Sequence, residues 1–222
     1  DWAAGKRISG YSSGSDWAWA VDFSPDGRHV VSVQGGDVHV WRADTGALVA
    51  KAPKESQDGR VAVFVGNDTV AYSDGPVLLW GFGGKDAPRK LALTGLGSMA
   101  TDSKGEALLL GKGDLRQDFF LFDPRGGELK ETELGAVEAR TVRYLPARRS
   151  FAVASCNDGV VFWPRPGERQ PSGTPRACAE VAALGEDGRR VLLATLSGRA
   201  IVVTDVEQPQ AARKLPATRL NE

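Results

Sequence analysis

Val38-His-Val-Trp41 is a short β-branched run that ends in a large aromatic residue, and the chain repeats it at a nearly constant interval. The four later copies begin 39, 42, 41 and 41 residues after one another: Val77-Leu-Leu-Trp80, Phe119-Phe-Leu-Phe122, Val160-Val-Phe-Trp163 and Ile201-Val-Val-Thr204. A fixed period of some tens of residues is typical of repeat architectures. The five copies therefore predict five structural units of about 41 residues.

A second landmark runs in step with the first. Ala20-Val-Asp-Phe-Ser-Pro-Asp-Gly27 predicts a strand that enters a Pro-Asp-Gly turn, because proline presets the first turn position and glycine tolerates positive φ. Weaker copies occur at residues 61–68, 99–105, 141–148 and 181–188, and each is followed by another apolar run. A hairpin turn, such as Asp74-Gly75, then leads into the aromatic-ended strand.

Each unit is thus predicted to be a four-stranded antiparallel meander, in an all-β chain with very little helix. The strands carry apolar residues on both faces, so each sheet must be covered by neighbours on both sides. Radial stacking of the sheets into a β-propeller satisfies this requirement. We expect a single domain over residues 1–222, with an N-terminal segment at 1–16 and repeats at about 17–53, 58–94, 97–135, 138–177 and 178–218.

The sequence of the first unit resembles a WD40 repeat, from Ala20-Val-Asp-Phe-Ser-Pro-Asp-Gly27 to Val38-His-Val-Trp41, and Asp74-Gly-Pro-Val-Leu-Leu-Trp80 resembles the end of the third strand in such a repeat. Two features of the family are altered. The Gly-His dipeptide that precedes the first strand is absent, and the Asp after the aromatic residue is kept only as Asp123 and Asp205. The departures predict that the family's buried hydrogen-bond network is missing and that packing provides the stability.

The number of units leaves two arrangements open. Five units can close into a five-bladed ring, or they can form a segment of a larger propeller. Residues 5–13 could supply an outer strand to the last unit, in competition with residues 213–217, or could belong to a preceding unit. An unclosed stack would expose apolar faces that soluble monomers avoid, so further blades or a second subunit would then cover its ends, and an incomplete ring could self-associate.

Composition argues against several classes of function. Lys+Arg and Asp+Glu are both 28, so the formal net charge is zero and a generally basic nucleic-acid binder is disfavoured. Only two histidines and two cysteines occur, without metal-ligand spacing, so we expect no metal site and no cofactor. No apolar run reaches the length of a membrane span, and no signal peptide is visible. Two lone thiols, Cys156 and Cys178, favour a reducing compartment, and we expect the protein to be cytoplasmic.

Candidate binding residues come from aligning the units on the apolar position before the first turn. Six residues earlier lies a ring of entrance-loop residues: Trp17, Asp58, Gly95, Glu138 and Cys178. We select Trp17, Trp19, Asp58 and Glu138 as partner-binding candidates, since tryptophan is enriched in binding hot spots. The alternative for the two tryptophans is packing between blades or over a turn. Packing between blades is the interpretation of the aromatic residues that recur at the repeat period, Trp41, Trp80, Phe122 and Trp163.

Two further patterns could suggest chemistry, but neither is complete. A two-residue hairpin at Gly35-Gly36 would place Ser32 opposite His39, but no third residue or nucleophile elbow completes a catalytic group. Residues 135–176 contain seven arginines and three acidic residues, which gives a local charge of +4, but the arginines fall on different predicted loops. We therefore assign no catalytic residue and expect no nucleic-acid partner.

These observations favour a non-catalytic interaction scaffold or sensor module, with another protein or a neighbouring domain of the same polypeptide as partner. The high alanine, glycine and arginine content resembles that of GC-rich bacteria, where WD40-like domains are common appendages to kinases, NTPases and proteases. We therefore expect the chain to be part of a larger bacterial protein. The alternative is a ligand-binding or hydrolytic propeller with a site at the mouth of its channel.

Overall fold

The structure is a computed structural model of the 222-residue chain. It describes residues 18–53, 59–113, 117–132, 139–146, 149–155, 159–163, 181–184, 190–195, 200–205 and 213–216. Within these ranges the regular structure is entirely β-strand. The prediction of an all-β chain is confirmed for the described residues.

The first sheet is a meander in the order β1-β2-β3-β4, with every neighbouring pair antiparallel. Its strands are β1 (Ala18–Phe23), β2 (His29–Gln34), β3 (Asp37–Arg42) and β4 (Leu48–Lys51). Gly27 takes a φ of 70° in the turn between β1 and β2. Gly35 and Gly36, with φ of 55° and 78°, form the predicted two-residue hairpin between β2 and β3, since glycine adopts these angles without steric cost.

The second and third sheets repeat this topology. Their strands are β5 (Ala62–Phe64), β6 (Thr69–Ser73), β7 (Pro76–Gly81), β8 (Arg89–Thr94), β9 (Leu96–Thr101), β10 (Leu108–Lys112), β11 (Asp118–Phe122) and β12 (Leu129–Glu131). The aromatic-ended runs at Trp80 and Phe122 end or nearly end the third strand of each sheet, as Trp41 does in the first. The sequence period therefore corresponds to one sheet.

The remaining described strands form two more sheets, one with three strands and one with four. They are β13 (Ala139–Leu145), β14 (Ser150–Ser155), β15 (Gly159–Trp163), β16 (Val181–Leu184), β17 (Arg190–Thr195), β18 (Ala200–Asp205) and β19 (Arg213–Pro216). β19 pairs with β18 at the outer edge of the last sheet. This strand comes from the segment predicted to compete with residues 5–13 for that edge. Residues 5–13 lie outside the described residues, so their place stays a prediction.

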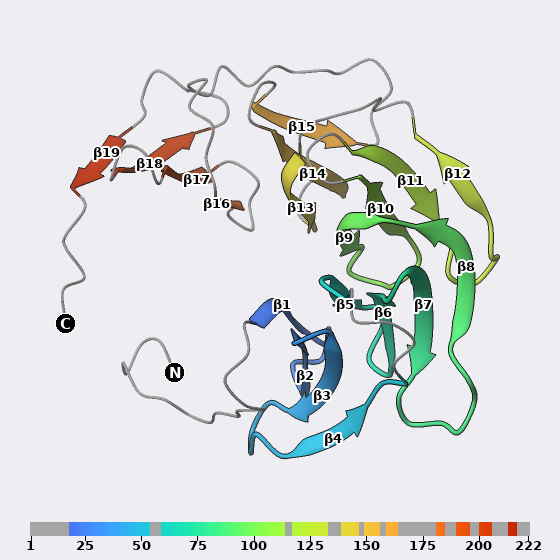
Figure 1. Cartoon of the computed structure of the whole chain (residues 1–222). Coiled ribbons are helices and arrows are strands. Elements are labelled where there is room, and N and C mark those ends of the chain that lie inside the picture. Colours follow the sequence, from blue (N-terminus) through green and yellow to red (C-terminus); the bar gives the residue numbers. More distant parts are fainter. Residues whose placement is uncertain are drawn as a thin grey trace.

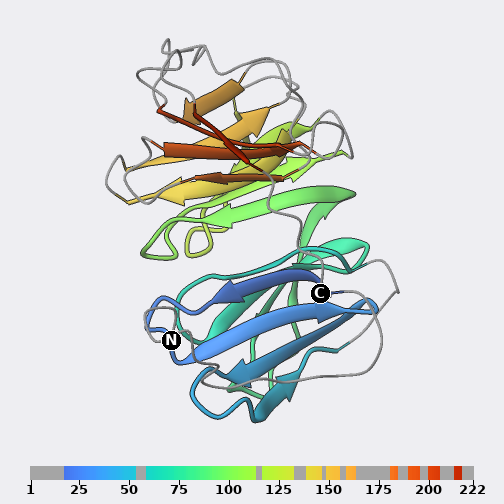
Figure 2. The same ribbon diagram turned by 90° about the vertical axis from the view of Figure 1, so that its left-hand side faces the viewer.

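The five sheets fan out around a common centre, with the first strand of each on the inside (Figure 1). The inner strands contact one another in succession: β1 with β5, β5 with β9, β9 with β13 and β13 with β16. The described strands trace an open arc with the first and last sheets at its two ends, and Figure 2 looks into that opening. Radial stacking of antiparallel sheets is thus observed, whereas a closed five-bladed ring stays a prediction.

The core lies between successive sheets. Valines of the first sheet meet apolar residues of the second in one buried cluster that includes Phe64, Tyr72 and Trp80. The second sheet meets the third through Leu79, Leu108 and Phe122, among others. The third meets the fourth around Phe119 and Phe151. Burial of apolar area between sheets stabilises the arc, so each sheet depends on its neighbours.

Candidate functional site

The inner strand of the first sheet, β1, sends its side chains alternately toward and away from the second sheet. Ala20 packs against the cluster shared with the second sheet, and the Asp22 carboxylate Oδ2 accepts the backbone N–H of Phe64 at 2.9 Å. By alternation, Val21 and Phe23 point away from the second sheet. Both are largely exposed, at 57% and 60%.

Asp22 joins the first two sheets near the centre of the arc. Burial raises the pKa of its carboxyl above the ordinary value, because a low-dielectric environment disfavours the charged form. The hydrogen bonds from the backbone N–H groups of Phe64 and Phe23, and the positive charge of Arg143 on β13, partly oppose this rise in pKa. The Asp22 carboxylate therefore accepts a hydrogen bond between the two sheets, and it is not an exposed group available for acid–base chemistry.

Val21 and Phe23 belong to a surface that we name the leading face of the first sheet. Cross-strand pairing places Phe23 beside Val30, Val30 beside Trp41, and Trp41 beside Leu48, so these side chains share a face. The face changes across the sheet from buried Val30 and Trp41 to exposed Phe23 on the inner strand and exposed Leu48 on the outer strand. Along this row of residues the leading face is therefore apolar, buried on the two middle strands and exposed on the inner and outer strands.

Ser32, His39 and Trp41 provide the polar groups of the leading face. The indole Nε1–H of Trp41 donates a buried hydrogen bond to Ser32 Oγ at 2.9 Å, and the rings of His39 and Trp41 lie 5.4 Å apart. Ser32 and His39 are directly paired across β2 and β3, as predicted. The absence of the family's full buried hydrogen-bond network stays a prediction, but this sheet does contain one buried polar bond, in which the hydroxyl of Ser32 gives the buried indole an acceptor.

His39 is buried, and its Nδ1 atom has no hydrogen-bond partner among the described residues. Burial lowers the pKa of the imidazole from its ordinary value of 6.5; the nearby Lys51 lowers it further, and Asp37 opposes the shift. Ser32 Oγ already receives the Trp41 indole N–H. The Ser32–His39 pair therefore belongs to the structure of the sheet, without the geometry of an activated nucleophile.

Trp19 lies at a bulge near the start of β1, and its side chain is 56% exposed. The guanidinium carbon of Arg60, just before β5, lies 5.5 Å from the centre of the Trp19 ring. The Trp19–Arg60 pair therefore spans the entrances of two adjacent inner strands, and it combines an aromatic face with an exposed cation.

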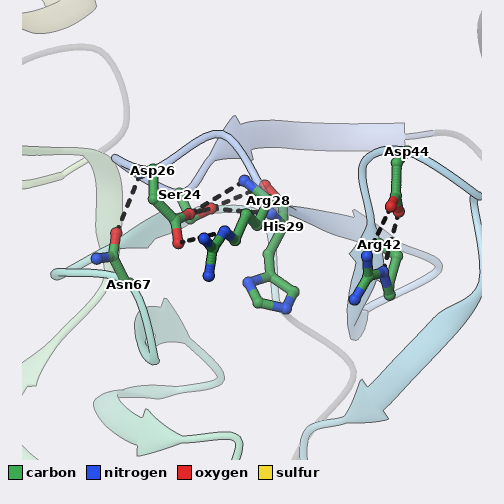
Figure 3. A network of polar contacts seen from close by, with 7 residues as sticks. All are labelled: Ser24, Asp26, Arg28, His29, Arg42, Asp44 and Asn67. Atoms are coloured by element: carbon green, nitrogen blue, oxygen red, sulfur yellow. Dashed lines mark hydrogen bonds and ion pairs between the residues drawn. The ribbon is translucent and has the colours of Figure 1, made fainter.

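The turn after β1 is fixed by a polar network (Figure 3). The Asp26 Oδ1 atom accepts the Ser24 hydroxyl at 2.7 Å and the Arg28 backbone N–H at 3.0 Å, and these bonds lower the pKa of Asp26. The backbone N–H of Asp26 donates to Asn67 Oδ1 of the second sheet. The network aligns two neighbouring turns, and its groups are engaged with one another.

Figure 3 also shows an ion pair on the loop after β3. Arg42 donates through Nε and Nη2 to the two carboxylate oxygens of Asp44, at 2.9 and 2.6 Å. These hydrogen bonds lower the pKa of Asp44 to about 2. Because both side chains are exposed, the pair fixes the local loop and contributes little to overall stability.

The predicted partner-binding residues are only partly described. Trp19 is exposed, whereas Trp17, Asp58 and Glu138 lie outside the described residues. Trp41, Trp80 and Phe122 are buried; Trp163 ends β15, but its side chain is outside the description. Sequence reasoning missed Arg60, Val21 and Phe23. The repeat period could have identified Arg60, because it stands 41 residues after Trp19 and so occupies the same position in the next unit.

The described part of the chain offers neither a metal site nor a helical membrane span. Among the described residues, no three His, Cys, Asp or Glu side chains are grouped so that they could hold a metal ion. Nor do these residues include a helix of sufficient length and hydropathy to cross a bilayer.

Comparison with known proteins gives a match in structure alone. No protein-family model and no curated protein matches the sequence. The β-propeller domain of Cps50 (Swd1) from Myceliophteria thermophila matches with a TM-score of 0.67 and 14% identity, over 90% of this chain and 74% of that chain. This chain has the WD40-type β-propeller fold. Because 1171 solved chains match this chain, the likeness identifies the fold and leaves function to be argued from the surface.

Proposed function

We propose that this propeller is a non-catalytic scaffold that binds another protein, or a neighbouring domain of a larger bacterial polypeptide, through the entrance side of its first two sheets. The supporting observation is the Trp19–Arg60 pair, in which an indole that is more than half exposed lies against an exposed guanidinium. Tryptophan and arginine are the residue types most enriched among binding hot spots. A rigid sheet on either side holds both groups in place, which reduces the entropy lost on binding.

The chemistry of the pair indicates the kind of segment that would bind. The exposed indole face offers apolar contact, and the guanidinium offers a planar donor to a carboxylate. A protein segment with an apolar side chain next to an aspartate or glutamate satisfies both groups. A cytoplasmic location is a further proposal, supported by the two lone cysteines, and cell fractionation would test it.

A photo-crosslinking amino acid at position 18, which is exposed and adjacent to Trp19, tests the proposed function. In cells that express the chain, we expect adducts to a specific polypeptide from position 18 and none from position 49, an exposed site on β4. Trp19→Ala and Arg60→Glu should each remove the adduct, whereas Leu48→Ala should leave it unchanged. Equal adducts from both positions, or adducts that survive Trp19→Ala, would contradict the proposal.

A further inference from the structure

Trp19 and Arg60 come from different sheets, and the backbone of each is held within its own part of the structure. Trp19 is the extra residue of a bulge in β1, and the residues on either side of it, Ala18 and Ala20, are both paired with β2. A bulge of this kind re-aims one side chain while the strand around it stays in the sheet. The position of the Trp19 backbone is therefore set by the first sheet.

Arg60 lies in the short segment that leads into β5, and its two neighbours in the chain are closely packed or hydrogen-bonded. Gly59 is buried, and a Cβ added there would lie 3.0 Å from the Gly36 carbonyl oxygen and 3.1 Å from that of Ser73. The carbonyl oxygen of Val61 accepts the Ser73 backbone N–H at 3.0 Å. The guanidinium is exposed, but the backbone that carries it is fixed on both sides.

The relative position of the first two sheets then decides whether the indole and the guanidinium meet. Two polar bonds join these sheets along β1 and the turn after it: Asp22 Oδ2 accepts the Phe64 N–H at 2.9 Å, and the Asp26 N–H donates to Asn67 Oδ1 at 3.1 Å. Asp22 lies three residues from Trp19, about 10 Å along an extended strand. Asp26 lies in the turn beyond the opposite end of β1. The Asp22 bond is therefore the polar link nearer to the recognition pair.

The junction between the second and third sheets lacks both features. The residue 41 positions after Asp22 is Val63, whose side chain has no hydrogen-bond acceptor. The bulge residue of β9 is Gly97, which has no side chain to place against Arg60, and the side chain of Gln117 fills the space that a Cβ would need there. The carboxylate bond and the aromatic–cation pair therefore occur together at the first junction and are both missing at the second.

We propose that Asp22 is a positioning residue for the Trp19–Arg60 pair, because its bond to the Phe64 N–H holds β1 against β5 so that the indole and the guanidinium stay in contact. This inference rests on the proposed function, since it concerns how that binding site is assembled. Without the bond, the apolar core still joins the two sheets, but the entrance ends of β1 and β5 are free to separate. The pair is then assembled in only a fraction of the molecules, and the affinity for a partner segment falls by that fraction.

The test uses the 222-residue chain with isotope-labelled arginine. NMR measures the upfield ring-current shift of the Arg60 side-chain resonances, which are assigned with Arg60→Lys and calibrated as the shift that Trp19→Leu removes. Asp22→Val and Asp22→Ala both remove the acceptor, so the second serves if the first does not fold, whereas Asp22→Asn keeps an acceptor. The matched controls are Asn67→Ala, which removes the other bond between the sheets, and Ser32→Ala, which removes a buried bond within the first sheet.

The variants without an acceptor at position 22 should lose about half or more of the ring-current shift and give about threefold less crosslinking from position 18. Asp22→Asn and both controls should keep the shift and the adduct, even where stability falls. A full shift without the acceptor, or an equal loss in either control, would overturn the positioning role, because a general loss of stability would then explain the change. The predicted shifts in a chain that gives no specific adduct would support the positioning role and refute the proposed function.

Discussion

Phe23 and Phe64 occupy the same position in successive repeats, yet one is 60% exposed and the other is fully buried. Both strands alternate in the same way, and both phenylalanines precede a turn. The difference shows that a repeat unit of this propeller does not bury its own apolar residues. The preceding sheet buries them, so the energetic value of a side chain depends on its place in the arc as much as on its identity.

The largest expected effect separates the two phenylalanines directly. Phe64→Ala removes a fully buried ring and leaves a cavity between two sheets, so we expect a loss of about 3–5 kcal/mol in the free energy of unfolding. Phe23→Ala should change that free energy by less than about 1 kcal/mol, because the ring is already largely hydrated. Urea unfolding of the two variants measures both values, and equal losses would contradict the assigned exposures.

Asp22 tests the link between the two sheets. Asp22→Val places the type of residue found one repeat later, Val63, at this position and removes the acceptor of the Phe64 N–H, so we expect a loss of about 1–3 kcal/mol. Urea unfolding at pH 7 measures the loss, and an unchanged midpoint would show that the bond between the sheets contributes nothing to stability.

Asp22→Asn keeps an acceptor and removes the buried charge. Because the folded pKa of Asp22 is raised, the folded chain binds more protons than the unfolded chain above pH 3.8, and stability falls as pH rises through the folded pKa. The Asn variant should therefore gain stability relative to wild type at pH 7 and lose that advantage in acid. Unfolding curves across pH measure the difference in stability between Asp22→Asn and wild type. A difference that does not change with pH would show that the titration of Asp22 is not its cause.

The Trp41–Ser32 hydrogen bond separates polar from apolar stabilisation in the first sheet. Trp41→Phe keeps an aromatic ring but removes the indole donor, and Ser32→Ala removes the acceptor. A double-mutant cycle should give a coupling of about 1 kcal/mol between the two positions. Additive losses would mean that packing alone stabilises the sheet, as expected from the sequence.

His39 should give the smallest effect, and one that depends on pH. Its folded pKa lies below 6.5, so beneath pH 6.5 the unfolded chain binds more protons and the stability of the fold declines. His39→Leu mimics Leu78, which is paired at the corresponding place in the second sheet. The variant should show a flatter profile between pH 7 and 5 than wild type. Parallel profiles from thermal unfolding would assign the pH dependence to other groups.

Much of the architecture was predictable because repetition converts sequence spacing into sheet topology. The run Val38–Trp41 and its copies located the third strand of each sheet, and Gly35-Gly36 gave the hairpin that sets Ser32 opposite His39. The candidate site was less accessible to sequence reasoning. The exposure of Phe23 depends on whether another sheet lies against it. The repeat period cannot show this, because it predicts the same burial for Phe23 and Phe64. The Trp41–Ser32 bond was missed because the prediction rested on the absent Gly-His dipeptide, whereas this bond needs only Trp41 and Ser32, which are both present.

The most direct test of the exposed inner edge of the leading face is the reactivity of a thiol placed at position 23. Phe23→Cys and Phe64→Cys variants of the 222-residue chain, with Cys156 and Cys178 replaced by serine, would be labelled with a thiol reagent under native conditions. The account predicts that the thiol introduced at position 23 reacts at close to the rate of an unfolded control. The thiol introduced at position 64 should react at least about 100-fold more slowly, because its labelling requires local opening. Equal protection of the two thiols would show that the first sheet is already covered and would contradict the account.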